Sequence, residues 1–279
     1  MGRTGPHPGG GFHELPLVLF TAMGMAGGGI GAARVLQGAL SGRLPTLTRA
    51  ESILLSVLLG TGFLISAWHL GRPLRGHLAL RGLGRSPLSN EVVALGVTLT
   101  GALLGAGLPP THRLQGVSDL VAGVGSVAFL LAVGVVYRLP GQLAWRGMVV
   151  FHPLVLGTTW GLLMTDARLG SPTAEATLRT VLVALLVDGV LVLVRNAAME
   201  RAGRKGAASY PGVFRFRGLV MGARLASSAL LTPLALLEGQ WWIAVGTLSL
   251  ACLLDRFGFY ALSVRQTTES EVARVEALL

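Results

Sequence analysis

The chain has 279 residues, of which 52% are hydrophobic and 13% are charged, and its mean hydropathy is +0.64. Soluble domains carry about 25% charged residues, so this composition excludes a water-soluble globular enzyme. The net charge of +10 lies mostly in short segments between apolar runs, a distribution that argues against nucleic-acid binding.

Eight apolar runs follow one another along the chain, each about long enough to cross a bilayer once. The segments between them are polar and rich in Gly, Pro, Ser and Thr, as is typical of loops. The sequence therefore predicts an all-α polytopic membrane protein, a single domain over residues 1–279 that forms a bundle of eight transmembrane helices. The helices are predicted at residues 15–39, 47–70, 91–108, 117–137, 148–164, 176–194, 218–237 and 241–262.

An even number of helices places both termini on the same side of the membrane, which we call side A; the opposite side is side B. Most Lys and Arg residues fall on side A, in the terminal segments and in the loops near 71–87, 138–146 and 195–217. The positive-inside rule predicts that side A is cytoplasmic. The same basic surface would also suit docking of an acidic partner protein.

Ionisable residues of the predicted helices gather toward side A. An ionisable group inside a bilayer costs free energy and is a functional candidate by default. A transporter needs polar sites near the midplane, so this one-sided distribution favours a site reached from a single side. The residues at the side-A ends are His13, Glu14, His69, Glu91, Tyr137 and His152, and Asp188, Arg224, Asp255 and Arg256 follow within two to three turns.

His69 and Glu91 form the most informative pair. A loop of about twenty residues connects them, which predicts that they lie at similar depth on neighbouring antiparallel helices. A histidine can take up a proton at neutral pH, and a carboxylate at the membrane edge can pass it on. Oxidation of a quinol requires this chemistry, because two protons leave as two electrons depart. An interfacial histidine and a glutamate that favours the helix dipole would give the same pattern.

Histidine positions also allow a b-type haem, which needs two axial ligands at one depth on facing helices. His69 and His152 would meet this requirement, with His13 as a third candidate. No second tier of histidines lies near side B, so a haem could not carry electrons across the membrane. We therefore expect no haem, and the single cysteine, Cys252, cannot hold an iron–sulfur cluster.

Arg224 is expected to form an ion pair with Asp188 or Asp255 inside the membrane. Neither charge is tolerated alone in lipid, so a pair with a structural role explains their presence.

Two motifs carry a resemblance to a known family. The sequence reads His-Glu-Leu-Pro-Leu-Val-Leu-Phe-Thr at residues 13–21, and Trp-His-Leu-Gly-Arg-Pro at residues 68–73 precedes Pro-Leu-Ser-Asn-Glu at residues 87–91. These motifs resemble the opening and the helix 2–helix 3 junction of the membrane anchor subunit of bacterial dimethyl sulfoxide reductases. Val136-Tyr137 and the Arg-Phe-Gly-Phe-Tyr run at 256–260 also fit, and the resemblance spans nearly the whole length.

The resemblance implies a haem-free anchor subunit that binds and oxidises menaquinol. Electrons would pass to an iron–sulfur subunit and then to a molybdopterin catalytic subunit, which determines the terminal acceptor. The family's quinol-site histidine and glutamate fall on His69 and Glu91. As further quinol-binding residues we expect Arg72, Asn90 and Tyr137 to orient the quinone oxygens, with His13, Glu14 and His152 farther out.

The resemblance also implies a location in the bacterial cytoplasmic membrane with side A facing the periplasm, whereas the positive-inside rule predicts the opposite orientation. Three alternatives stay open at this point: a b-type cytochrome anchor subunit, a secondary transporter, and an anchor with no redox function.

Overall fold

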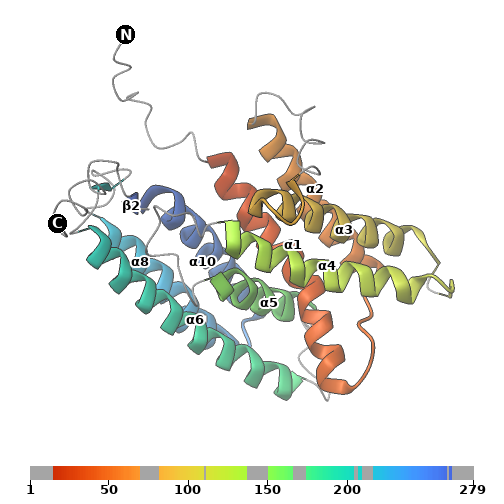
Figure 1. The fold of residues 1–279 in the computed structure, drawn as a ribbon. Helices are drawn as coiled ribbons and strands as arrows, with labels where there is room; N and C mark the ends of the chain where they lie inside the picture. Colours follow the sequence, from red (N-terminus) through yellow and green to blue (C-terminus); the bar gives the residue numbers. More distant parts are fainter. Residues whose placement is uncertain are drawn as a thin grey trace, which may run out of the picture.

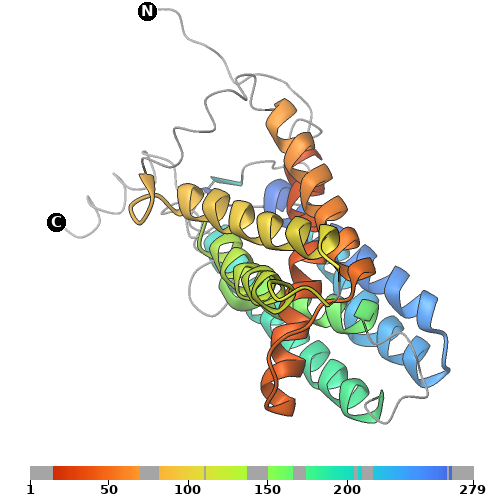
Figure 2. The same cartoon turned by 90° about the vertical axis from the view of Figure 1, so that its right-hand side faces the viewer.

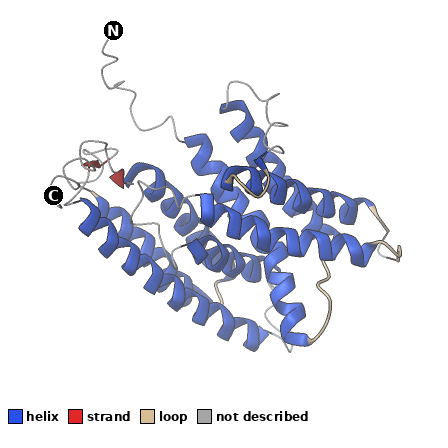
Figure 3. Ribbon diagram, viewed as in Figure 1, coloured by secondary structure: helices blue, strands red, loops and turns tan. Residues whose placement is uncertain are grey.

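The computed structural model describes residues 15–69, 82–109, 111–136, 150–165, 174–203, 207–208, 216–262 and 264–265. Within these ranges almost all regular structure is helical (Figure 3). The exception is a two-residue antiparallel pairing of β1 (Ala207–Ala208) with β2 (Val264–Arg265). The predicted all-α fold is confirmed.

The helices follow the eight predicted apolar runs in number and order. Seven spans among the described residues are long and apolar enough to cross a membrane. The exception is α5, whose 14 residues extend about 21 Å at 1.5 Å per residue. The bounds are Leu15–Ser41 for α1, Arg49–His69 for α2, Pro87–Gly107 for α3, Gln115–Val136 for α4, His152–Thr165 for α5, Ala174–Gly203 for α6 and Trp241–Leu262 for α10. The seventh span consists of α8 (Arg217–Leu225), the π-helical η4 (Ala226–Leu231) and α9 (Thr232–Leu237).

The largest error in the predicted boundaries is at the end of the sixth helix. The sixth apolar run was expected to end at residue 194, with Arg195 opening a basic loop, but α6 continues to Gly203. The side chain of Arg195 is fully buried inside the bundle and does not belong to a basic surface. A charged residue with a buried partner can continue a membrane helix, whereas the sequence pattern treats any charge as an end.

The outer surface of the helices is apolar. Large side chains such as Leu64, Leu186 and Leu219 are each more than 60% exposed in the isolated protein. Apolar surface of this extent is the signature of a membrane or protein interface. Together with the apolar spans, it identifies a multi-pass membrane protein.

Helix α1 occupies the centre of the bundle. It packs against α2 and α4 on one side and against α5 and α10 on the other (Figure 1). A Cβ atom at Gly29 would overlap the carbonyl oxygen of Gly157, and one at Gly161 would overlap the carbonyl oxygen of Gly29. The backbones of α1 and α5 are therefore in direct contact, as small residues allow in membrane helices.

Polar contacts tie the side-B ends of α1, α2 and α3 together. Thr48 and Glu51 form a capping box at the start of α2, in which Thr48 N donates to Glu51 Oε2 at 2.9 Å. Arg34 of α1 pairs with Glu51, and Arg49 Nε donates to the carbonyl oxygen of Ala106 at 3.0 Å. From this end α2 and α3 diverge toward side A (Figure 2).

Candidate functional site

The backbone places the predicted proton-handling pair at one end of the bundle. His69 is the last residue of α2, and Glu91 lies near the start of α3. Helices α2 and α3 are consecutive and antiparallel, so both residues lie at their side-A ends, where the two helices have diverged (Figure 2). The structure describes His69 by its backbone only.

Glu91 is a buried carboxylate with spare hydrogen-bonding capacity. The residue is 3% exposed, and its Oε1 atom has no hydrogen-bond partner among the described residues. A buried acceptor without a partner costs free energy, so such an atom invites an explanation. A ligand hydroxyl group that donates to Oε1 would supply the missing hydrogen bond.

Asn90 has a structural contact and also lines a cavity. Its Oδ1 accepts a hydrogen bond of 2.8 Å from the backbone N of Gly84, whose positive φ of 76° suits glycine in this turn. This contact fixes the turn that leads into α3. Asn90 also borders an apolar cavity of about 570 Å³ between α3 and α4, whose other walls include Leu83, Val93, Val97, Leu120 and Val124.

Four of the predicted site residues lie outside the described ranges. These are His13, Glu14, Arg72 and Tyr137.

His152, the first residue of α5, lies between two aspartates. It is 1% exposed, with Nε2 at 2.7 Å from Asp188 Oδ1 and Nδ1 at 3.4 Å from Asp255 Oδ2. Asp188 belongs to α6 and Asp255 to α10, so three helices meet at this imidazole.

The predicted pairing of Arg224 is confirmed for both aspartates. Nη2 of Arg224 donates to the two oxygens of Asp188 at 2.7 and 2.8 Å, and Nε lies 3.6 Å from Asp255 Oδ1. Its Nη1 atom donates to Ser228 Oγ at 2.5 Å. The guanidinium thus connects α8 with α6, α10 and the following π-helical turn.

Two further arginines surround Asp255. Arg195 Nη1 lies 2.5 Å from Asp255 Oδ1, and Arg256 Nε donates to Asp255 Oδ2 at 3.0 Å. We call His152, Asp188, Arg195, Arg224, Asp255 and Arg256 the buried ionic cluster; each of them is at most 1% exposed.

The π-helical segment η4 helps to build this cluster. Thr232 Oγ1 donates to the carbonyl oxygen of Ser227, five residues earlier, at 2.7 Å. Ser227, Ser228 and Thr232 are all buried, so the wider turn directs three hydroxyl groups inward. Such π-helical turns occur frequently at functional sites.

Sequence reasoning missed the place of Arg195 in the cluster. The residue lies seven positions after Asp188, which is two helical turns and therefore the same face of α6. That spacing is the signal that would have kept Arg195 inside the helix.

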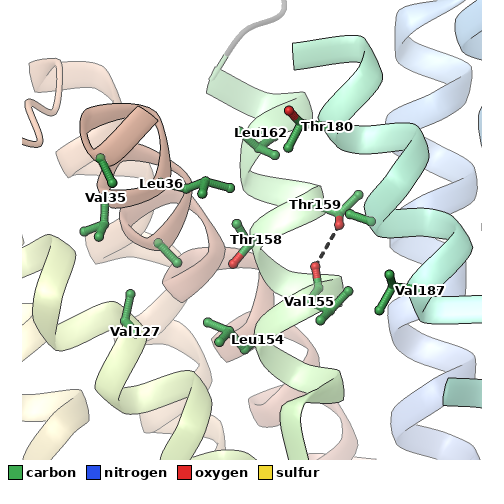
Figure 4. A pocket seen from close by; sticks show the side chains of 13 residues that line it. Val35, Leu36, Val127, Leu154, Val155, Thr158, Thr159, Leu162, Thr180 and Val187 are labelled. Atoms are coloured by element: carbon green, nitrogen blue, oxygen red, sulfur yellow. Dashed lines mark hydrogen bonds between the residues drawn. The ribbon is translucent and has the colours of Figure 1, made fainter. Parts of the chain in front are cut away.

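A second cavity lies between α1, α4, α5 and α6. It measures about 400 Å³ and is lined mostly by aliphatic side chains (Figure 4). The hydroxyl groups of Thr159 and Thr180 donate to carbonyl oxygens of their own helices, at 2.7 and 2.8 Å. No titratable side chain occurs among the described residues that line this cavity, so it suits an apolar chain but offers no group to accept a proton.

The family of the protein follows from a match to a family model. The model of the DMSO reductase anchor subunit (DmsC) matches residues 9–201, which is more than half of the sequence. The chain belongs to this family. The resemblance seen in the sequence motifs is therefore confirmed.

Relatives of this anchor subunit are subunits of anaerobic dimethyl sulfoxide reductases. It is 42% identical over 89 residues to the C subunit of that enzyme from Escherichia coli (strain K12), or 31% of either protein. It is 30% identical over 166 residues to the C subunit from Haemophilus influenzae, which covers 56% of this protein and 55% of that one. A third relative, the YnfH subunit of Escherichia coli, is 38% identical over 93 residues, or 31% of either protein. The alignments thus span between about a third and just over half of these relatives.

The family match covers one part of the anchor subunit described above. Residues 9–201 include α1 to α5 and most of α6, and they contain His69 and Glu91. Three members of the buried ionic cluster, Arg224, Asp255 and Arg256, lie beyond this segment.

Proposed function

We propose that this anchor subunit binds and oxidises menaquinol at the side-A ends of α2 and α3. The observation that carries the proposal is the buried carboxylate of Glu91, whose Oε1 lacks a hydrogen-bond partner among the described residues. It lies at the same end of the bundle as His69. A histidine and a carboxylate so placed can take up the protons that leave a quinol with its two electrons.

In this proposal His69 accepts a proton from a quinol hydroxyl group, and Glu91 relays protons toward side A. The apolar cavity beside Asn90 is a suitable place for the apolar part of the quinol, because its remaining walls are aliphatic. Arg72 and Tyr137 would orient the quinone oxygens, with His13 and Glu14 farther out. His152 takes no part, since both of its ring nitrogens face carboxylates of the buried ionic cluster.

The electrons would leave through partner subunits. The named relatives are subunits of dimethyl sulfoxide reductases, which supports a multi-subunit enzyme. The protein has one cysteine, so an iron–sulfur subunit would have to receive the electrons and pass them to a molybdopterin catalytic subunit. We place the protein in the bacterial cytoplasmic membrane, with side A and both termini on the periplasmic face as the family resemblance implies.

The alternatives fit the geometry less well. A b-type haem would have to bind His152 at Nδ1, which makes no hydrogen bond but lies 3.4 Å from Asp255 Oδ2, next to side chains that are at most 1% exposed. A secondary transporter would need polar groups near the bilayer midplane, whereas the cavity between α1, α4, α5 and α6 is apolar.

The proposal is tested with membranes that contain the whole complex and the variants His69→Ala and Glu91→Gln. Quinol-driven reduction should fall about 100-fold or more, because general acid–base catalysis contributes at least that factor. Activity with a reduced viologen, which bypasses the anchor, should be unchanged. The exposed residues His112 and Glu175 provide matched controls, and His112→Ala and Glu175→Gln should keep both activities. Full quinol activity in the His69 and Glu91 variants would overturn the proposal.

A further inference from the structure

Helix α6 is separated from the centre of the bundle by one short helix. Among the described residues, α6 packs on α5 and on the α8–η4 segment, and it makes no extensive contact with α1 or α4. Helix α5 lies between them and joins α1 through the backbone contacts of Gly157 and Gly161. The space in front of α5, with α1 and α4 on one side and α6 on the other, is the apolar cavity of about 400 Å³ (Figure 4).

This cavity lies in the side-B half of the membrane. Its walls include residues 32–39 of α1 and residues 180–187 of α6. Helix α1 ends at Ser41 and α6 begins at Ala174, and both of these ends are on side B. Each wall extends about 10 Å at 1.5 Å per residue. The cavity therefore starts close to the side-B surface and reaches toward the bilayer midplane.

The lining of the cavity suits an apolar chain. Apart from Thr158, Thr159 and Thr180, the lining residues are aliphatic. The hydroxyl groups of Thr159 and Thr180 already donate to carbonyl oxygens of their own helices. A polar head group inside this cavity would exchange its hydrogen bonds with water for apolar surroundings, which costs free energy.

The cavity opens on the surface that the membrane contacts. Val187 of its lining is 43% exposed, and the neighbouring Val183 and Leu186 on α6 are 61% and 70% exposed. Exposed apolar side chains on a membrane bundle face lipid. A lipid chain can therefore enter the cavity from the side without crossing a polar surface.

Two exposed arginines lie near the side-B end of the cavity, one after α1 and one on α6. The backbone N of Arg43 donates to the carbonyl oxygen of Gly38 at 2.8 Å, which holds Arg43 against the last turn of α1. Arg179 directly precedes the lining residue Thr180, and its exposed ion pair with Glu175 contributes little. A guanidinium group binds phosphate strongly, so both arginines suit the head group of a phospholipid.

We propose that the cavity binds one acyl chain of an anionic phospholipid from the side-B leaflet, whose phosphate group lies at Arg43 and Arg179. The chain fills the space that α5 leaves between α1 and α6. The inference does not rest on the proposed quinol oxidation, because the cavity lies in the opposite half of the membrane from Glu91.

The apolar tail of a quinone is the competing occupant. The position of the cavity argues against it, because the proposed quinol head group lies at the side-A ends of α2 and α3. A separate cavity of about 570 Å³ borders Asn90 at that end and is closer to the proposed site.

The test uses the whole complex in phosphatidylcholine nanodiscs that contain a trace of photoreactive phosphatidylglycerol. The reactive diazirine group sits near the end of one acyl chain, and mass spectrometry identifies the cross-linked peptides. We expect cross-links to Leu154 and Val155, deep in the cavity, in preference to Leu186 on the outer surface. An excess of unlabelled phosphatidylglycerol should abolish them.

Substitutions on α6 separate the cavity from the outer surface. Ala184→Trp fills the cavity and should abolish the cross-links to Leu154 and Val155. Val183→Trp is the matched control: it adds the same side chain at the adjacent, exposed position, and it should keep the cross-links.

The head-group contacts are tested by the double variant Arg43→Gln, Arg179→Gln. About tenfold more phosphatidylglycerol should then be needed for competition, the order of the effect that basic residues have at an anionic membrane surface. This variant leaves the lining unchanged, so it also tests the inference should Ala184→Trp fail to assemble.

Four results would overturn the inference. The first is loss of the cross-links with excess menaquinone but not with excess phosphatidylglycerol, which would assign the cavity to a quinone. The second is absence of cross-links to the lining in the assembled complex, as expected if a partner protein covers it. The others are equal labelling of Ala184→Trp and Val183→Trp, and unchanged competition in the double arginine variant.

Discussion

Arg224 shows what a charged residue needs in order to stay inside a membrane bundle. Its guanidinium contacts both oxygens of Asp188, lies near Asp255 and donates to Ser228, while the side chain is fully buried. Removal of one partner from such a set leaves the others charged and without compensation, which costs more than the pair contributes when intact. The cluster is therefore sensitive to single substitutions.

We expect Arg224→Met to destabilise the protein by about 3–5 kcal/mol, because Asp188 is left as a buried uncompensated charge. The measurement is unfolding of the detergent-solubilised protein by heat or denaturant. Arg179→Met is the matched control: it breaks an ion pair with Glu175 in which both side chains are 76% exposed, and it should leave stability almost unchanged. Equal stability of the two variants would show that the cluster is not structurally important.

The length of helix α5 does not by itself show whether this helix crosses the membrane. It has 14 residues, fewer than the roughly 20 that normally span a bilayer. It nevertheless packs backbone to backbone against α1 through Gly157 and Gly161, and it begins with His152 of the cluster. A short helix surrounded by protein can still connect the two sides of the membrane, since its ends need not reach lipid.

Cysteine labelling tests whether α5 crosses the membrane. Single cysteines at the exposed positions Ser41, Arg85 and Gln240 would be probed with a reagent that does not cross membranes. Cys252 is buried and should give little background. If α5 crosses, Ser41→Cys and Gln240→Cys label from the same face and Arg85→Cys from the other. Labelling of Gln240→Cys together with Arg85→Cys would mean that α5 does not cross.

Most helices could be predicted from the sequence because a membrane span is a local property of the polypeptide. The apolar run at 241–262 matches α10 at both ends, and the start of α1 is also correct. The end of α6 could not be predicted, since Arg195 pairs with a carboxylate 60 residues later in the sequence. The pairing of Arg224 with Asp188 and Asp255 could be predicted, because all three residues were expected to lie inside the membrane, where a charge needs a partner.

The candidate site was predictable in part for the same reason. The ends of α2 and α3 are joined by one loop, so the sequence brings His69 and Glu91 to one side of the membrane. The burial of the Glu91 carboxylate, by contrast, depends on tertiary packing. The capping contact of Asn90 with Gly84 likewise required the geometry of the turn.

At the scale of the whole molecule, the bundle consists of two groups of helices around α1. One group, α2 to α4, carries Glu91 and the cavity beside Asn90. The other, α5 to α10, contains the buried ionic cluster. In our account the first group binds the quinol, and the second holds the buried ionic cluster.

The most direct test of this account is the position of bound quinone. The complex would be irradiated with a photoreactive menaquinone analogue, and the cross-linked peptides would be identified by mass spectrometry. The account predicts cross-links near His69 and Glu91, at the end of α2 and the start of α3, that excess menaquinone abolishes. Competable cross-links confined to the apolar cavity between α1, α4, α5 and α6, with none near Glu91, would contradict it.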